Sequence, residues 1–379
     1  MRIAPHLVHP MPIIIPTYGH GTRGREAMRL ALRINDFVNY DSNGSLDEQK
    51  HIANGRTLSR REVLELLPDI SPDGLNGGVM FFDAQVYNSE RLVLSFLKSA
   101  AQIGGDLANY ARVVSFLTDG ARVIGAKVQD CVSGHEFDVR ARVVVNSTGA
   151  WNDWVRQLLP NAAPRKPVPL AKAINIVTYP LFRDVAVGVD SHEPGNRLFY
   201  VTPWRHRSII GTHYTPYDDH PESLNVTYDE IDQFLQRVNR SIPSAKLTHA
   251  DVSFVHRGLL PVVDQNTLRS VYLRRDARIT DHARESIDGL VSVEGVRYAT
   301  SRRVAVDVVD HVLEMTDCTP VDSVSATTPL RGGEMQRFKT YLERELAANS
   351  RRLDHANLKQ LICNYGSDYA DVLEYLPLS

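Results

Sequence analysis

Cysteine is scarce in this chain. Cys131, Cys318 and Cys363 are the three thiols among 379 residues, and they lie far apart in the sequence. Three scattered cysteines supply neither the disulfide framework of a small secreted domain nor the paired ligand spacing of a zinc site. The scarcity favours a reducing compartment, and we therefore predict a cytoplasmic protein that holds no metal.

Charge of one sign is not in excess, and long hydrophobic runs are missing. The 43 Lys and Arg residues nearly balance the 45 Asp and Glu residues, and no basic block occurs. A nucleic-acid partner is therefore not expected. The longest apolar run near the start, Met11–Pro16, is interrupted by prolines and is too short to span a bilayer. No signal peptide precedes it.

The segment Arg142–Trp151 is the most informative stretch that is present. It begins as a run of valines, which is typical of a buried parallel strand, and it ends in Asn-Ser-Thr-Gly. Ligands of open α/β sheets bind just beyond the carboxyl ends of such strands. Residues 146–151 could therefore form the lip of a cofactor site. An ordinary strand that ends in a glycine turn is the alternative.

The residues before this segment follow an informative order. A helix is predicted between Asn88 and Gly105, with Asn88 or Ser89 as the cap and Gly104-Gly105 as the stop signal. Three short β runs follow at 111–117, 121–128 and 136–145, with Asp119-Gly120 and Ser133-Gly134 as hairpin signals. This order resembles the second half of the adenine-dinucleotide domain of glutathione-reductase-like flavoproteins.

The second half of the chain reads as a β-rich region followed by helices. Strands are expected at 170–177 and 252–261, with a hairpin that joins 198–204 to 208–212. This region would cover a flavin site or form a plain β domain. Leu290–Thr300 then leads into a helix over 301–315, whose N-terminus would favour an anion. Two more helices are expected at 334–348 and 353–364.

The first quarter of the chain gives weaker signals. Residues 1–20 read as extended or irregular, and Ser59 with Glu62 has the spacing of a capping box at the start of a helix over 59–67. A helix over 23–39 would place Arg25, Arg29 and Arg33 on one face, which could lie on an anionic membrane surface. A basic face that is simply solvated is the alternative.

Together these segments resemble the FAD-dependent glycerol-3-phosphate dehydrogenase family along nearly the whole chain. Their order and spacing carry the resemblance more than any one motif. The segments are Ala4-Pro-His-Leu-Val8 with Pro10 and Pro16, Glu90-Arg-Leu92, Asn146–Trp151, Pro203-Trp204 with Gly211-Thr212, Gly258-Leu-Leu-Pro261, Glu294–Arg302, Thr328–Gly333 and Tyr365-Gly366.

The resemblance implies FAD as the cofactor and glycerol 3-phosphate, or a similar small phosphate ester, as the substrate. The family transfers a hydride from C2 of glycerol 3-phosphate to the flavin, forms dihydroxyacetone phosphate and passes the electrons to a membrane quinone. The protein would then be cytoplasmic and could associate with the inner face of the membrane. No catalytic residue follows from the resemblance. The implied cofactor contacts are Val113, Thr148, Gly149, Trp151, Gly295, Val296, Tyr298 and Thr300, and the implied substrate contacts are Lys172, Asn175, Arg257 and Arg297.

The sequence departs from the family pattern at several places. The run Gly19-His-Gly-Thr-Arg-Gly24 has the Gly-x-Gly-x-x-Gly spacing of dinucleotide binding, but the proline-rich stretch before it is expected to be extended or irregular and not the opening strand of a βαβ unit. Leu260 stands where an Arg is usual, and Arg257 is a possible replacement. Asn175, Arg297 and Ala299 stand where His, Lys and Thr are common. Two alternatives therefore remain beside the enzyme: a fragment or non-catalytic relative that does not hold FAD, and a related flavin dehydrogenase with another substrate.

The predicted fold class is mixed α/β and α+β. We expect a partial glutathione-reductase-like FAD domain over 1–166 that lacks its N-terminal βαβ unit, and a β-rich substrate domain over 167–289. Residues 290–318 would return to the FAD domain, and 319–379 would form a linker and a truncated helical module. A missing βαβ unit would leave an exposed apolar sheet edge near Val143–Val145, which predicts poor solubility.

Overall fold

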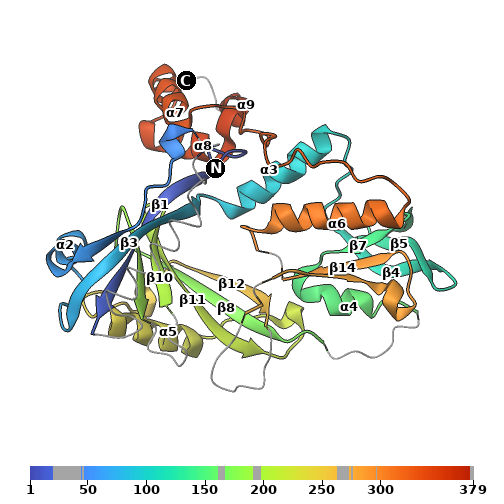
Figure 1. Cartoon of the computed structure of the whole chain (residues 1–379), viewed down its shortest axis with the longest axis horizontal. Helices are drawn as coiled ribbons and strands as arrows, with labels where there is room; N and C mark the ends of the chain where they lie inside the picture. Colours follow the sequence, from blue (N-terminus) through green and yellow to red (C-terminus); the bar gives the residue numbers. More distant parts are fainter. Residues whose placement is uncertain are drawn as a thin grey trace.

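The computed structural model describes residues 1–19, 44, 47–160, 167–190, 198–262, 273–274, 276–295 and 297–375. An eight-stranded sheet dominates one half, and smaller sheets form the other half (Figure 1). The large sheet has the order β12-β8-β11-β10-β9-β1-β3-β2. Its strands are β1 (Val8–Tyr18), β2 (Arg56–Ser59), β3 (Leu75–Val86), β8 (Leu170–Thr178), β9 (Ala186–Asp190), β10 (Leu198–Trp204), β11 (Arg207–Tyr217) and β12 (Phe254–Pro261).

Helix α5 (Tyr228–Ser241) covers one face of this sheet (Figure 1). Phe234 of α5 is buried against Phe199 of β10, with the two rings edge to face at 6.0 Å. Alternate residues of β8, among them Ile174 and Ile176, belong to the same core. Because side chains alternate along a strand, the residues between them lie on the opposite face of the sheet.

Strand β1 corrects the expectation that residues 1–20 are extended or irregular. It pairs with β3 along its whole length, from Val8 opposite Val86 to Tyr18 opposite Leu75. Its three prolines all occupy even positions, so their missing N–H groups fall on one edge of the strand. The other neighbour of β1, β9, pairs only with Ile13 and Ile14, so none of the three prolines is needed in that shorter ladder.

Strands β1 to β3 also differ from the predicted domain division, which placed residues 1–166 in the FAD domain. All three extend the large sheet, so residues 8–86 pack with the predicted substrate region. Helix α2 (Arg60–Leu66) packs on their end of the sheet and begins with the predicted Ser59–Glu62 capping box. No strand was predicted over residues 75–86, where the long β3 lies.

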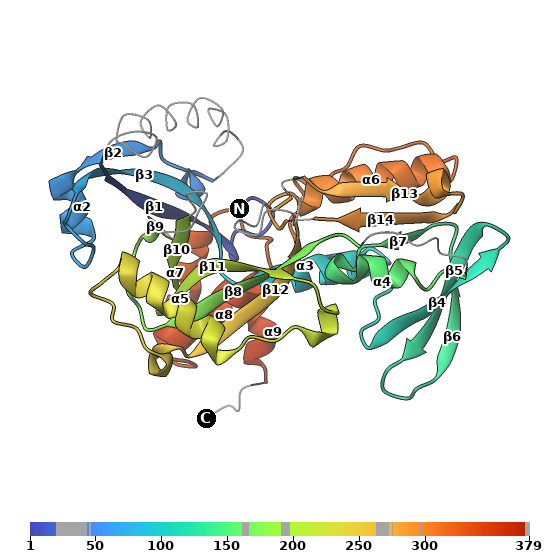
Figure 2. The same ribbon diagram turned by 90° about the horizontal axis from the view of Figure 1, so that it is seen from below.

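The other half contains two three-stranded sheets, of order β13-β14-β7 and β4-β5-β6. Helices α6 and α4 lie on opposite faces of the first sheet, and the second sheet projects beyond it (Figure 2). Strands β7 and β14 are parallel, with Val145 opposite Val291. The elements are β4 (Ala111–Asp119), β5 (Arg122–Asp130), β6 (Glu136–Arg140), β7 (Val144–Asn146), β13 (Arg278–Asp281), β14 (Leu290–Glu294), α4 (Asn152–Arg156) and α6 (Ser301–Met315).

The predicted strand over 136–145 is divided in the structure. Its first part, β6, closes the meander with β5, and its last part, β7, leaves for the sheet of β14. In the part of the chain that the structure describes, β7 pairs with β14 alone and therefore forms an edge. Val145 is 38 % exposed there, in line with the expected apolar edge.

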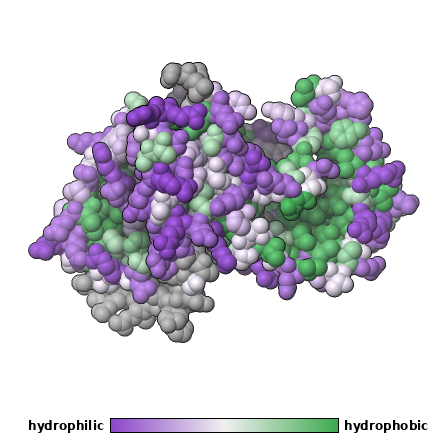
Figure 3. All heavy atoms as spheres, turned by 90° about the horizontal axis from the view of Figure 1, so that it is seen from above, coloured by the Kyte–Doolittle hydropathy of each residue, from purple (hydrophilic) through white to green (hydrophobic). Residues whose placement is uncertain are grey.

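Helix α3 (Ser89–Gln102) lies between the two halves (Figure 1). Asn88 caps it, as predicted, and it ends before Gly104. Seen from above, the half that contains the meander is hollowed, and the hollow is hydrophobic (Figure 3). Large apolar side chains that this half and α3 leave exposed include Val93, Leu94, Leu97, Phe137, Val139 and Val145.

The chain closes with the helices α7 (Phe338–Asn349), α8 (His355–Tyr365) and α9 (Tyr369–Leu373). They form their own hydrophobic cluster and lie beside the first residues of the chain (Figure 1). The backbone N–H of Leu330 donates to the carbonyl of Ile3, and Leu330 packs with Ala4 and Leu7. The predicted helical module is therefore joined to the start of the described chain.

The predicted basic helix over 23–39 lies outside the described residues. Among the helices that are described, none combines the length and apolar character that crossing a membrane requires.

Candidate functional site

The first part of the candidate site is the lip that follows β7. The side-chain oxygen of Asn146 accepts hydrogen bonds from the backbone N–H of Thr148, at 3.3 Å, and from its hydroxyl, at 2.7 Å. Gly149 then adopts a φ of +61°, and no atom lies within 4 Å of the position that a Cβ would occupy. The backbone at Gly149 is therefore open to a ligand, and the cofactor contacts expected of Thr148 and Gly149 stay a prediction.

A buried pair of asparagines holds this lip against β14. The Asn152 side chain donates to the carbonyl of Val293 at 3.1 Å and to that of Asn146 at 3.2 Å. The Asn146 side chain donates in return to the Asn152 carbonyl at 3.1 Å. Because both side chains are at most 4 % exposed, these bonds fix the lip to the neighbouring strand.

The second part is the loop from β14 into α6. Gly295 has a φ of +74°, and Tyr298 and Thr300 are exposed in the turn before the helix. Thr300 occupies the N-cap position without a side-chain capping bond, and the first turn of α6 has no acidic residue. The N-terminal N–H groups and the helix dipole therefore favour an anionic or electron-rich group. Val296 lies outside the described residues.

The lip also meets the end of the large sheet. A small cavity of about 10 Å³ separates them, lined by Gly149, Ala150, Asn152, Asp153, Val168, Leu170, Pro261 and Glu294. Trp151, which is 40 % exposed, lies on the same turn as Gly149. Val113 lies in the meander, opposite Val128 in β5. No printed contact connects Val113 to the lip, so its predicted adenine contact stays a prediction.

The four predicted substrate residues are not brought together on one face. Lys172 lies on the α5 face of β8, where it pairs with Glu230 and donates to the Asn225 carbonyl at 3.1 Å. Arg257, opposite Ile174, lies on the same face, with its guanidinium 3.5 Å from the side-chain oxygen of Asn225. The alternation along β8 places Asn175 on the other face.

The ion pair on the α5 face is stable in its charged form. Burial raises the pKa of Glu230, but hydrogen bonds from Lys172 and from the backbone N–H of Thr227 outweigh it and lower the pKa. The Lys172 side chain is therefore held by its ion pair with Glu230 of α5. The sequence could not reveal this, because an alternating strand does not state which of its faces meets the helix.

Asn175 is the predicted substrate residue that lies on the open side of the sheet. Its side-chain oxygen accepts from the Thr212 hydroxyl at 2.9 Å, which leaves its amide N–H groups as donors. On the adjacent strand, Gly258 lies on the same face, and nothing lies within 4 Å of its Cβ position. A polar donor therefore stands beside an open patch of sheet.

An aromatic cluster borders this patch, and sequence reasoning missed it. The ring of His256, opposite Asn175, meets the ring of Trp204 at 5.6 Å, edge to face. The guanidinium of Arg205 lies 4.7 Å from the Trp204 ring. The His256 Nε2 atom and the Arg205 Nε atom are buried and have no hydrogen-bond partner in the described part of the chain. Period-two placement of His256 beside Gly258 was the signal that could have found it.

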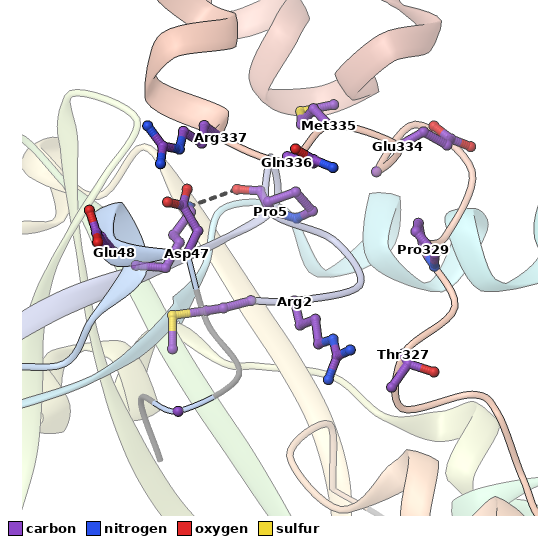
Figure 4. A pocket seen from close by; sticks show the side chains of 14 residues that line it. Arg2, Pro5, Asp47, Glu48, Thr327, Pro329, Glu334, Met335, Gln336 and Arg337 are labelled. Carbon is purple, nitrogen blue, oxygen red and sulfur yellow. Dashed lines mark hydrogen bonds between the residues drawn. The ribbon is translucent and has the colours of Figure 1, made fainter. Parts of the chain in front are cut away.

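A larger cleft of about 810 Å³ lies elsewhere, between the start of the chain and the linker before α7. Asp47 and Glu48 line it on one side, and Met335, Gln336 and Arg337 on the other (Figure 4). Its buried cation, Lys50, already donates to the carbonyls of Pro5 and Val8. None of the predicted site residues lines this cleft.

Known proteins share this architecture. A family model described as FAD dependent oxidoreductase matches residues 2–284. A glycerol-3-phosphate dehydrogenase of Synechocystis sp. is 28 % identical over 98 % of this chain and 68 % of its own length. An α-glycerophosphate oxidase of Streptococcus pyogenes is 27 % identical over 80 % of this chain and 50 % of its own length.

The structure of the glycerol-3-phosphate dehydrogenase from Bacillus halodurans, complexed with FAD, superposes with a TM-score of 0.78. It is 24 % identical, and the match covers 99 % of this chain and 66 % of that one. The chain thus spans half to about two thirds of the length of these relatives. The predicted mixed α/β fold is confirmed, and the chain belongs to the FAD-dependent oxidoreductase family.

Proposed function

We propose that this chain takes part in the FAD-dependent oxidation of glycerol 3-phosphate to dihydroxyacetone phosphate. The observation that carries the proposal is that the open backbone at Gly149 and the end of β14 meet the same end of the large sheet, where Gly149, Glu294, Leu170 and Pro261 line one small cavity. Relatives named glycerol-3-phosphate dehydrogenase and α-glycerophosphate oxidase support the choice of substrate.

The residues of this site fit a dinucleotide flavin. Thr148 and Gly149 offer backbone groups without an intervening side chain, and the uncapped start of α6 suits the electron-rich end of the ring. When bound, FAD supplies the acceptor for the hydride. Asn175, fixed by Thr212, would orient a substrate hydroxyl, and Trp204 would exclude water at the far end of the patch.

The test is whether purified chain keeps FAD and uses glycerol 3-phosphate. We expect flavin absorbance to remain with the protein through gel filtration and to bleach when glycerol 3-phosphate is added without oxygen. Chain that stays colourless after incubation with FAD would support a relative that does not hold the cofactor. Bleaching by an amino acid, with no response to glycerol 3-phosphate, would instead reassign the substrate.

We also propose a membrane quinone as the electron acceptor, with the chain on the cytoplasmic side of the membrane. The relatives include both dehydrogenases and oxidases, so the acceptor is tested by comparing a soluble quinone analogue with oxygen. Faster reoxidation by oxygen would refute the quinone. Charge reversal of Arg25, Arg29 and Arg33 to Glu should release the chain from anionic liposomes if the membrane contact is real.

A further inference from the structure

The proposed substrate carries a phosphate dianion, and Arg205, a cation that borders the open patch, stacks on the rings of Trp204 and Tyr87. Lys172 and Arg257 lie on the α5 face, where Glu230 and Asn225 engage them. Leu260 shares the open face with His256 and Gly258, because β12 alternates, but it is apolar. A phosphate group requires charge-assisted donors, for which arginine is particularly suited. This inference rests on the proposed function.

Arg274 approaches this site from the far side of Pro261. Its backbone N–H donates to the Pro261 carbonyl at 3.2 Å, so its main chain is held at the end of β12. Its Cδ atom lies 3.3 Å, and the Pro261 ring 3.7 Å, from the position that a Cβ on Gly295 would occupy. Arg274 therefore packs between the end of the large sheet and the loop that leads into α6.

Arg297 joins Arg274 at the same place. Its guanidinium donates to the Arg274 carbonyl at 2.9 Å, which brings a second cation to the loop after Gly295. The ion pairs of the described residues include neither arginine, and the Arg274 Nε atom is buried without a hydrogen-bond partner. The Arg297 guanidinium thus lies against the main chain of Arg274, and in the described part of the chain neither arginine has a carboxylate partner.

We propose that Arg274, together with Arg297, forms the site that binds the phosphate of the substrate. A buried guanidinium nitrogen without an acceptor is costly, and a phosphate oxygen would satisfy it. The inference assigns the role that Leu260 cannot fill to a residue 14 positions further along the chain. Arg257, the replacement suggested by sequence proximity, faces away from the open side of the sheet.

The experiment uses the full chain and isothermal titration calorimetry with glycerol 3-phosphate, inorganic phosphate and FAD as separate ligands. Arg274→Met keeps the length of the side chain and removes its charge, and Arg274→Lys restores the charge. Arg257→Met tests the opposite face, and Arg61→Met, an exposed arginine paired with Glu65 on α2, is the matched control.

Arg274→Met is expected to weaken glycerol 3-phosphate binding about tenfold or more, with partial recovery in Arg274→Lys. The affinity of Arg274→Met for FAD should stay within about twofold of that of the original chain. The affinities of Arg257→Met and Arg61→Met for glycerol 3-phosphate should also stay within about twofold. If Arg274→Met lost affinity equally for FAD and for glycerol 3-phosphate, the arginine would bind the cofactor phosphates, and the assignment would be overturned. Unchanged substrate binding in Arg274→Met, with a loss in Arg257→Met, would also overturn it.

The outcome for the proposed function is separate. If the original chain does not bind glycerol 3-phosphate but binds inorganic phosphate through Arg274, the phosphate site is supported and the proposed substrate is refuted. If it binds no phosphate compound at all, both are refuted. If it binds glycerol 3-phosphate independently of Arg274, the proposed function survives and this inference does not.

Discussion

His6 shows how one buried residue makes stability depend on pH. Its side chain is fully buried, and neither ring nitrogen has a hydrogen-bond partner among the described residues. Burial, followed by the nearby charges of Arg91 and Lys50, lowers its pKa from 6.5 to about 4. The folded protein therefore holds His6 neutral under conditions in which the unfolded chain binds a proton.

We predict that the free energy of unfolding falls as the pH drops from about 6.5 towards 4. In this window the unfolded state binds more protons, and the full pKa difference corresponds to about 3 kcal/mol. Urea unfolding at several pH values will measure the slope. His6→Gln should reduce it, whereas exposed His135→Gln should not, and buried His9, whose pKa is lowered to about 3, keeps part of the slope in each protein. Equal slopes in all three proteins would exclude His6 as the cause.

Gly366 gives a second prediction for a single residue. It has a φ of +60°, and a Cβ there would lie 1.6 Å from the Gly332 carbonyl oxygen. Gly366→Ala should lower the free energy of unfolding by about 3 kcal/mol, because strain and a backbone clash add. Gly104→Ala is the matched control, since it has a φ of +95° with open space around its Cβ. That variant should cost about 1 kcal/mol. If the two variants lost similar amounts of unfolding free energy, the backbone at Gly366 would have shifted to relieve the clash.

The lip after β7 behaves as one element because two asparagines join it to β14. Asn152→Ala should lower the free energy of unfolding by about 2 kcal/mol, since the carbonyls of Val293 and Asn146 lose a buried donor. FAD affinity should fall several-fold as the lip loosens. Fluorescence titration with FAD and urea unfolding will measure both effects. Asn109→Ala, at an exposed position, should change neither.

Element positions were largely predictable where local signals agree. Side-chain caps mark the starts of α2 and α3, and alternation marks the strand β8 and the hairpin of β10 and β11. Helix α6 follows from the strand and glycine before it, although Thr300 makes no side-chain cap. The prolines of β1 hid a strand, because sequence alone does not tell which edge a strand exposes. The division between β6 and β7 was missed for a related reason: pairing partners are distant in sequence.

The site was predictable as a set of segments rather than as a surface. The lip at Gly149 and the loop at Gly295 follow from small residues at a strand end. Lys172 and Asn175 are three positions apart in β8, so alternation places their side chains on opposite faces of the sheet. Which of the two faces is covered by α5 is known only from the structure. Arg274 lacked any local signal, because its place depends on packing against Pro261 and Gly295.

At the scale of the whole molecule, the hydrophobic hollow of Figure 3 predicts how the chain behaves in solution. Val93 and Leu97 of α3 are each 42 % exposed, and β7 leaves an unpaired edge in the described part of the chain. We expect strong ANS fluorescence and concentration-dependent association in gel filtration. Val93→Lys with Leu97→Glu should reduce both. A chain that elutes as a monomer without ANS binding would contradict this expectation.

The contact between residues 3–7 and residues 330–366 also orders the events of folding. The hairpin of β1 and β3 can form early, since its strands are separated by fewer than 80 positions on the chain. Ile3, His6 and Leu7 instead contact residues more than 300 positions away in the chain, and these contacts can form only after those residues have been synthesised. Contacts of such high order form late and slowly during synthesis on the ribosome. Residues 3–7 are therefore buried later than the hairpin of β1 and β3, and until then their apolar side chains are exposed to a chaperone.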